Sequence, residues 1–263
     1  MSLSNLEQPL IQEQPLIQEQ PLIQEQPLKA IKDADITLTL DTSGSMFERQ
    51  QFIINGVKEV VEKQKALFDG TSYNCTITIN TFSSKGMYKT LFFRKPIFEF
   101  SNLEAKDIIC NGMTAFYDAI LQTLNLTFSE ETDQIHVFIS DGEENDSKVR
   151  ANDVKKKISS LKPNVSVIHF GSNQPIQQIN DNLGIDKNCS IPYYDGPNDD
   201  RTPSAFEVCG NLLNRALSSD NKICFTREEY DLLNSNINSQ KSPYLANSNI
   251  NDDLIDDQVP SKY

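Results

Sequence analysis

No run of eighteen or more apolar residues occurs in this 263-residue sequence, so no segment is expected to cross a bilayer. The first residues, Met-Ser-Leu-Ser-Asn-Leu, have neither the basic start nor the apolar stretch of a secretory signal. The five cysteines are widely spaced and form no C-x-x-C pair, which is typical of reduced thiols rather than of disulfides or a zinc site. These absences predict a cytoplasmic protein.

Basic residues are also few. The chain has 24 Lys and Arg against 37 Asp and Glu, a formal net charge of -13, which opposes binding to a phosphate backbone. Nucleic acid is therefore not an expected partner. The sequence lacks the G-x-x-x-x-G-K, G-x-S-x-G and H-E-x-x-H motifs, which removes the usual signatures of phosphate loops, hydrolases and metalloproteases.

The few residues with catalytic potential are not arranged for catalysis. His136 and His169 fall inside predicted strands, where a histidine buried in the core is the expected role, and no acid is placed to orient either one. Cys110 has no neighbouring base and is interpreted as a small apolar filler.

A hexapeptide repeat opens the chain. Residues 7–28 read EQPLIQ three times and then EQPL, with a proline in every unit. Regular proline interrupts helices and denies hydrogen-bond donors to strands, so residues 1–31 are predicted to form a disordered, polyproline-like arm. The alternative is that the repeat is a multivalent linear motif, because Pro-Leu-Ile recurs at a fixed spacing beside glutamates.

The other end of the chain is an acidic tail. Residues 219–263 are rich in Asp, Glu, Asn and Ser and contain too few apolar residues to order themselves. One short stretch differs, because Thr226 and Glu229 have the spacing of a helix capping box. A short helix near residues 226–237, docked on the domain, is therefore expected within the tail.

Between these ends, residues 32–218 alternate strand and helix patterns. Short segments rich in β-branched residues predict strands at 34–41, 75–82, 133–141 and 165–171. Helical periodicity appears at 48–68, 115–126, 147–162 and 203–218. Residues 87–94 read as an antiparallel strand on an edge, and a poorly defined sixth strand lies around 189–195. This order predicts a doubly wound α/β fold with a mostly parallel sheet, one antiparallel edge strand and helices on both faces.

The helix predicted at 48–68 has a clear apolar side. Its members are Phe52, Val57, Val60, Val61 and Leu67, which are expected to lie mostly on one buried face.

Oxygen-bearing side chains gather where the predicted strands end. Asp41 ends the first strand and begins the sequence D-x-S-x-S with Ser43 and Ser45, and Asp141 ends another strand. Thr114 follows a glycine in a loop that leads into a helix. The carboxyl ends of parallel strands meet at one rim, and carboxylates and hydroxyls are hard ligands that suit Mg²⁺ or Mn²⁺ rather than zinc or copper.

Each of these residues also has an ordinary structural explanation. Ser43 and Ser45 could be turn residues, Thr114 a helix N-cap and Asp141 the start of an Asx turn. The joint arrangement favours the metal site over these separate roles. The acids just after Asp141, namely Glu143, Glu144 and Asp146, are interpreted as a solvated cluster at a helix start, with tuning of metal affinity as the alternative.

The three motifs in this order, D-x-S-x-S, a later Gly-x-Thr and S-D-G, resemble the metal-ion-dependent adhesion site of the von Willebrand factor A domain. The resemblance covers residues 32–218 and is nearest to single A domains of bacterial and phage type, in which D-G-E-E-N recurs. It implies a Rossmann-like fold and direct metal ligation by Ser43 and Ser45. It also implies water-mediated ligation by Asp41, Asp141 and sometimes Thr114.

Two classes of function follow. The first is a non-enzymatic binding module, in which a protein partner offers an Asp or Glu to the bound ion. The second is a metal-assisted phosphoester hydrolase, for which only Glu143 and Glu144 are placed as general bases. A narrower option is an accessory subunit of an ATPase of the chelatase type. The sequence leaves the oligomeric state and the identity of the partner open.

Overall fold

The computed structural model describes residues 32–126, 131–141, 143–193, 195–196, 199–200, 202–218 and 223–234. The predicted arm at 1–31 and the tail from residue 235 onward lie outside the described residues. Within the described part, no helix is both long and apolar enough to cross a membrane.

A six-stranded sheet forms the centre of the molecule, in the order β3-β2-β1-β4-β5-β6. Every neighbouring pair is parallel except β2 and β3, which are antiparallel at one edge. The strands are β1 (Ala34–Asp41), β2 (Cys75–Phe82), β3 (Lys89–Pro96), β4 (Asp133–Ser140), β5 (Val165–Ser172) and β6 (Ser190–Tyr193). A separate two-stranded ladder joins β7 (Asp195–Gly196) and β8 (Asp199–Asp200). The predicted mostly parallel sheet with an antiparallel edge strand is confirmed.

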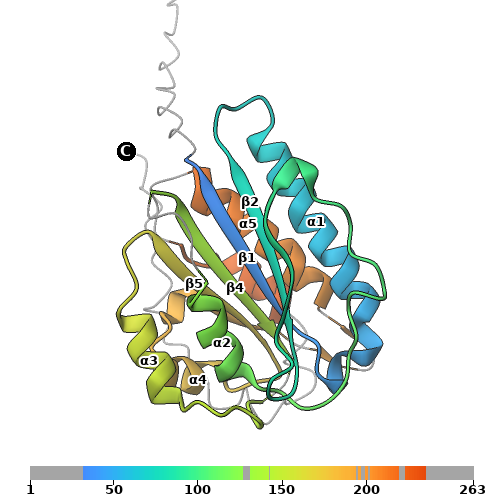
Figure 1. Cartoon of the computed structure of the whole chain (residues 1–263), viewed down its shortest axis with the longest axis vertical. Helices are drawn as coiled ribbons and strands as arrows, with labels where there is room; N and C mark the ends of the chain where they lie inside the picture. Colours follow the sequence, from blue (N-terminus) through green and yellow to red (C-terminus); the bar gives the residue numbers. More distant parts are fainter. Residues whose placement is uncertain are drawn as a thin grey trace, which may run out of the picture.

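Helices cover both faces of this sheet (Figure 1). One face packs against α1 (Gln50–Phe68) and α5 (Thr202–Ser218), and together they enclose the larger apolar cluster. The other face carries α2 (Phe116–Leu124), α3 (Ala151–Ser159) and α4 (Ile176–Leu183) around a second cluster. Alternation along the strands separates the two sides, because Ile36, Leu38 and Leu40 of β1 all belong to the larger cluster.

The start and the buried face of α1 differ from the prediction. A 3₁₀ helix, η1 (Gly44–Arg49), precedes it, so the α-helix begins at Gln50 rather than at residue 48. The buried face follows Ile53, Val57 and Phe68, and Phe52 is exposed. Phe52 lies one residue, about 100° of helical rotation, from Ile53, which turns its ring toward solvent.

The helix predicted at 147–162 is also shorter than expected, because α3 starts only at Ala151. The residues before it form a loop whose backbone amides bind carboxylates: Lys148 and Val149 both donate to Asp118 Oδ1 at 3.0 Å. Two further 3₁₀ turns are η2 (Ile97–Glu99) and η3 (Lys187–Cys189).

The short helix predicted in the tail is present as α6 (Arg227–Asn234). Its capping box is formed as predicted: Thr226 Oγ1 accepts from Glu229 N at 3.2 Å, and Glu229 Oε2 accepts from Thr226 N at 2.9 Å. The helix docks on the domain, because Leu233 is fully buried and Asn234 donates to the backbone oxygen of Pro192 in β6.

The sheet order places a switch point between β1 and β4. The chain runs from β1 outward through β2 and β3 on one side, and from β4 outward through β5 and β6 on the other. In such a fold the loops after β1 and β4 lead away in opposite directions. This opens a crevice at the carboxyl ends of these two strands, where doubly wound folds bind ligands.

Candidate metal centre

Asp41 is the last residue of β1 and is fully buried. Its Oδ1 accepts a hydrogen bond from Ser43 N at 2.8 Å, and its Oδ2 accepts one from Ser140 Oγ at 2.6 Å. Burial raises the pKa of this carboxyl to about 7, and the nearby charge of Asp141 adds to the shift. A cation beside Asp41 would stabilise the ionised form of this buried carboxyl and so lower its pKa.

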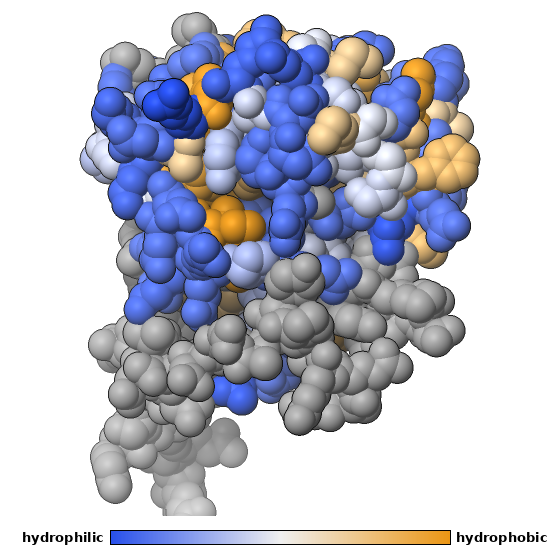
Figure 2. Space-filling model, turned by 90° about the horizontal axis from the view of Figure 1, so that it is seen from below, coloured by the Kyte–Doolittle hydropathy of each residue, from blue (hydrophilic) through white to orange (hydrophobic). Residues whose placement is uncertain are grey.

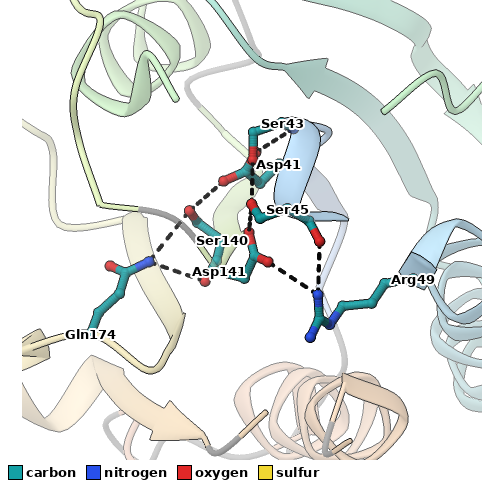
Figure 3. A network of polar contacts seen from close by, with 7 residues as sticks. All are labelled: Asp41, Ser43, Ser45, Arg49, Ser140, Asp141 and Gln174. Carbon is teal, nitrogen blue, oxygen red and sulfur yellow. Dashed lines mark hydrogen bonds and ion pairs between the residues drawn. The ribbon is translucent and has the colours of Figure 1, made fainter. Parts of the chain in front are cut away.

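The two serines of D-x-S-x-S connect Asp41 to Asp141 (Figure 3). The hydroxyl oxygens of Ser43 and Ser45 lie 3.0 Å apart, and Ser45 Oγ donates to Asp141 Oδ1 at 2.7 Å. The structure therefore brings four of the five predicted ligands into one continuous polar network, formed by the ends of β1 and β4 and by the first turn of η1.

Thr114, the fifth predicted ligand, is buried and is held through its backbone. Its N–H donates to Asn145 Oδ1 at 2.9 Å, and its carbonyl oxygen accepts from the amides of Asn145 and Asp146 at 3.0 and 3.2 Å. These bonds join Thr114 to the loop that follows Asp141. It is not the N-cap of α2, a position that Ala115 occupies without a capping side chain.

The loop before Thr114 is bound to the D-x-S-x-S turn. Asn111 N donates to the backbone oxygen of Thr42 at 2.9 Å, and Gly44 N donates to that of Gly112 at 3.0 Å. Gly112 has a φ of +78°, a conformation that favours glycine. The three motifs of the sequence are thus fixed to one another by main-chain hydrogen bonds.

Arg49 also contacts the candidate site, and the sequence analysis did not predict this contact. Its Nη1 donates to the backbone oxygen of Ser45 at 2.8 Å and lies 3.4 Å from Asp141 Oδ2 (Figure 3). Its position four residues after Ser45, one helical turn along, is a signal that could have found it.

Gln174 completes the network from the loop after β5. Its Nε2 donates to the backbone oxygen of Ser140 at 3.3 Å and to Ser140 Oγ at 3.4 Å. Because Ser140 in turn donates to Asp41, the buried amide of Gln174 orients that carboxylate indirectly. No sequence pattern marks this glutamine.

The residues present fit a hard divalent cation. The four predicted ligands in the network supply two carboxylates and two hydroxyls and neither imidazole nor thiolate, which is the donor set of Mg²⁺ or Mn²⁺. Across the described ranges, no group of three or more His, Cys, Asp or Glu side chains is arranged to hold a metal ion. Two of the four predicted ligands in the network are serine hydroxyls and so do not belong to those four residue types.

Glu144 has a structural role rather than the solvated one that was predicted. No helix starts beside it, and its two oxygens accept from the amides of Tyr117, Asp146 and Ser147 at 2.7–3.0 Å and from the Ser147 hydroxyl at 2.7 Å. A carboxylate saturated in this way holds the loop after β4 against α2.

The cysteine and histidine side chains do not supply a nucleophile or base at the site. Burial, and then the charges of Asp41 and Asp141, raise the pKa of Cys110 to about 11, which keeps the thiol protonated at neutral pH. Burial lowers the pKa of both His136 and His169 to about 4. Both histidines lie in the core, as predicted.

Comparison with known proteins adds evidence on the fold. No protein-family model and no curated protein sequence matches this chain. Among solved structures, the pilus adhesin SpaC from Lactobacillus rhamnosus GG matches with a TM-score of 0.52 and 13% identity, over 72% of this chain and 31% of that one. Proximal thread matrix protein 1 from the mussel byssus, with a zinc-occupied MIDAS motif, matches with a TM-score of 0.51 and 16% identity, over 70% and 46%.

The chain has the von Willebrand factor A fold. It spans less than half the length of either matched structure. At these identities the similarity shows the A fold alone and says nothing about a ligand or partner of this chain.

Proposed function

We propose that this A domain is a non-enzymatic module that binds a protein partner through a divalent cation. The ion, Mg²⁺ or Mn²⁺, would be held by Asp41, Ser43, Ser45, Thr114 and Asp141. The observation that carries this proposal is the convergence of two carboxylates and two serine hydroxyls at the switch point between β1 and β4.

The charge balance of the site explains why it would take a carboxylate. Asp41 and Asp141 neutralise a divalent ion, and hydroxyls supply little further negative charge, so the bound ion keeps an electrophilic position. A carboxylate from another molecule completes the coordination better than an amide of the same shape. The mussel protein, whose MIDAS motif is zinc-occupied, supports an occupied metal site on this fold.

A binding role fits the rim better than hydrolysis does. Of the two acids that could act as general bases, Glu144 is committed to four hydrogen bonds within the loop, and Glu143 is exposed. Cys110 is protonated, and both histidines are buried in the core. The adhesin among the matched structures also favours a protein partner.

Asp41→Ala tests the metal site. The change removes one of the two charged ligands, so affinity for Mg²⁺ and Mn²⁺ measured by calorimetry should fall by about a hundredfold or more, since losing half of the negative charge around a divalent ion is worth several kcal/mol. The far-ultraviolet circular dichroism spectrum should be unchanged.

Asp69→Ala is the matched control, because Asp69 is an exposed acid at the far end of α1. Its metal affinity should equal that of the wild type. Metal binding that survives undiminished in Asp41→Ala would show that the ion binds elsewhere.

A further inference from the structure

Exposed apolar side chains surround the candidate metal centre. Phe47 in η1 is 72% exposed, and Ile109, just before the loop that carries Thr114, is 65% exposed. Met113 in the same loop and Met87 in the turn between β2 and β3 are exposed as well. We name these four residues the apolar rim. Figure 2 looks onto this end of the molecule, where apolar side chains reach the surface among hydrophilic ones.

The segments that carry the apolar rim are bonded to one another. Gly44 N in η1 donates to the oxygen of Gly112 at 3.0 Å, and Met113 N donates to Ser84 Oγ at 2.8 Å. Met87 N donates to the oxygen of Ser84 at 2.8 Å. The segments that carry the rim are therefore held together beside the ends of β1 and β2, and they need not be assembled when a ligand binds.

A cation with exposed apolar side chains around it suits a peptide ligand in which an acidic residue has apolar neighbours. The chain itself contains such a sequence several times, in the repeat at residues 7–28, where the order Leu-Ile-Gln-Glu-Gln-Pro-Leu recurs. Glu13, for example, follows Leu10 and Ile11 and precedes Leu16. The acid would meet the ion while the flanking aliphatic side chains cover the rim.

We propose that the occupant of the metal centre is a glutamate of this repeat, with the adjoining Leu and Ile side chains packed on the apolar rim. The inference rests on the proposed function, because it uses the same ion. It gives the repeat a role as a ligand that the domain carries on its own chain and that an incoming partner must displace.

The arm is long enough to reach the site. Strand β1, with 8 residues, separates the point where the arm joins the sheet from the metal centre by about 26 Å, at roughly 3.3 Å per residue. Glu13 precedes Ala34 by 21 residues, and an extended chain of that length reaches about 65 Å at roughly 3.1 Å per residue. That leaves ample length to pass around the edge of the sheet.

Repetition strengthens a contact of this kind. A single glutamate with two aliphatic neighbours buries little area and should bind weakly alone. Several equivalent glutamates on one tether raise the effective concentration at the site, so that one of them occupies it most of the time.

The test uses the full chain with all four repeat glutamates changed to glutamine, which frees the site from its own arm. The substitutions are Glu7→Gln, Glu13→Gln, Glu19→Gln and Glu25→Gln. The probe is a fluorescent peptide of residues 7–18, followed by anisotropy in Mg²⁺. We expect saturable binding that becomes about tenfold weaker or worse in EDTA, and equally weak when the peptide carries Gln in place of Glu.

Rim variants of the same full chain separate this inference from simple carboxylate binding. Phe47→Ser and Ile109→Ser should each weaken the peptide several-fold and leave Mg²⁺ affinity unchanged. Phe98→Ser is the matched control, because Phe98 is 57% exposed but lies in η2, just after the end of β3, which pairs with the start of β2 and so lies at the opposite end of the strands from the metal centre. Its peptide affinity should equal that of the unsubstituted rim.

A second peptide, with an unrelated sequence and one Asp between aliphatic residues, makes the two proposals distinguishable. Binding of that peptide without binding of the repeat peptide would overturn the assignment of the arm and leave the proposed function standing. If the repeat peptide binds the rim variants as tightly as it binds the unsubstituted rim, the apolar rim has no role in binding. If the metal-loaded chain binds neither peptide, both proposals are wrong.

Discussion

Arg49 places a positive charge beside the carboxylate that a divalent ion would need. Its guanidinium contacts Asp141 Oδ2 at 3.4 Å and is anchored to the backbone of Ser45 at 2.8 Å. The Asp141 side chain is almost fully buried, so this contact is screened less than a surface ion pair would be. Arg49 therefore neutralises Asp141 when no ion is bound and competes with an ion that arrives.

Arg49→Met should tighten metal binding. Methionine keeps the length and apolar stem but removes the charge, so Mg²⁺ affinity measured by calorimetry should rise by about three- to tenfold, as expected for removing one nearby like charge. The metal-free protein should lose about 1 kcal/mol of unfolding free energy, because Asp141 loses a charged partner.

Arg227→Met is the control, since Arg227 pairs with Asp231 on the exposed side of α6. Arg227→Met should change neither the Mg²⁺ affinity nor the unfolding free energy by a measurable amount. A weaker rather than tighter affinity in Arg49→Met would mean that the arginine supports metal binding.

At the level of single residues, the sequence predicted which side chains lie together at the ends of β1 and β4 better than it predicted their surroundings. Asp41, Ser43, Ser45 and Asp141 stand at strand ends, and strand ends can be read from β-branched runs. Arg49 and Gln174 act through the tertiary arrangement, because each reaches a residue on a different element. Gln174 belongs to the loop after β5 and contacts Ser140 in β4, a meeting that only the completed sheet creates.

At the level of elements, α6 closes the edge of the sheet at β6. Glu229 forms two hydrogen bonds with Arg215 of α5, at 2.6 and 2.9 Å, and Asn234 Nδ2 donates to the oxygen of Pro192 at 2.9 Å. Leu233 is fully buried in the larger cluster. This short helix thus belongs to the folded domain, although its sequence lies within an acidic, Asn-rich stretch.

Leu233→Ala measures how much α6 contributes. Removing a fully buried leucine side chain should cost about 2–4 kcal/mol of unfolding free energy, measured by denaturant titration. The neighbouring Leu232, which is 39% exposed, is a matched control, and Leu232→Ala should cost well under half as much. Equal losses for the two changes would mean that α6 is not docked as described.

Strands were easier to predict than helix boundaries for a physical reason. The runs at 34–41 and 75–82 are almost entirely buried and rich in β-branched residues, and the predicted ends coincide with the ends of β1 and β2. Helix starts depend on the groups that bind the first free amides. Before α3, Asp118 of α2 binds the amides of Lys148 and Val149, and the nearby Glu144 binds that of Ser147, so the α-helix starts later than predicted.

For the whole molecule, buried ionisable groups set how stability depends on pH. In the metal-free protein, Asp41 binds its proton more tightly when folded, with a pKa of about 7 against 3.8 for a free side chain. Its contribution to stability is fully present below pH 3.8 and is lost as the pH rises through 7. His136 and His169 act in the opposite direction, because burial lowers the pKa of each from 6.5 to about 4.

These shifts predict that stability in EDTA rises from acid pH and levels off near neutrality. Between pH 4 and 6.5 the unfolded chain holds two histidine protons that the folded chain lacks, and the folded chain holds one proton on Asp41 that the unfolded chain lacks. The unfolding free energy should therefore fall by about 1.4 kcal/mol for each pH unit of acidification in this range. Above about pH 7 these two effects nearly cancel, so stability should stay constant, and chemical denaturation at half-unit pH steps measures both the slope and the plateau.

Asp41→Asn isolates the contribution of the histidines. The amide cannot ionise, so the slope between pH 4 and 6.5 should steepen from about 1.4 to about 2.7 kcal/mol per pH unit, since only the two histidines then act there. Saturating Mg²⁺ should steepen the slope of the wild type in the same way, because an ion that binds the ionised carboxylate is favoured as the pH rises. A wild-type slope in EDTA that is already as steep as that of Asp41→Asn would mean that Asp41 is ionised in this range even without metal.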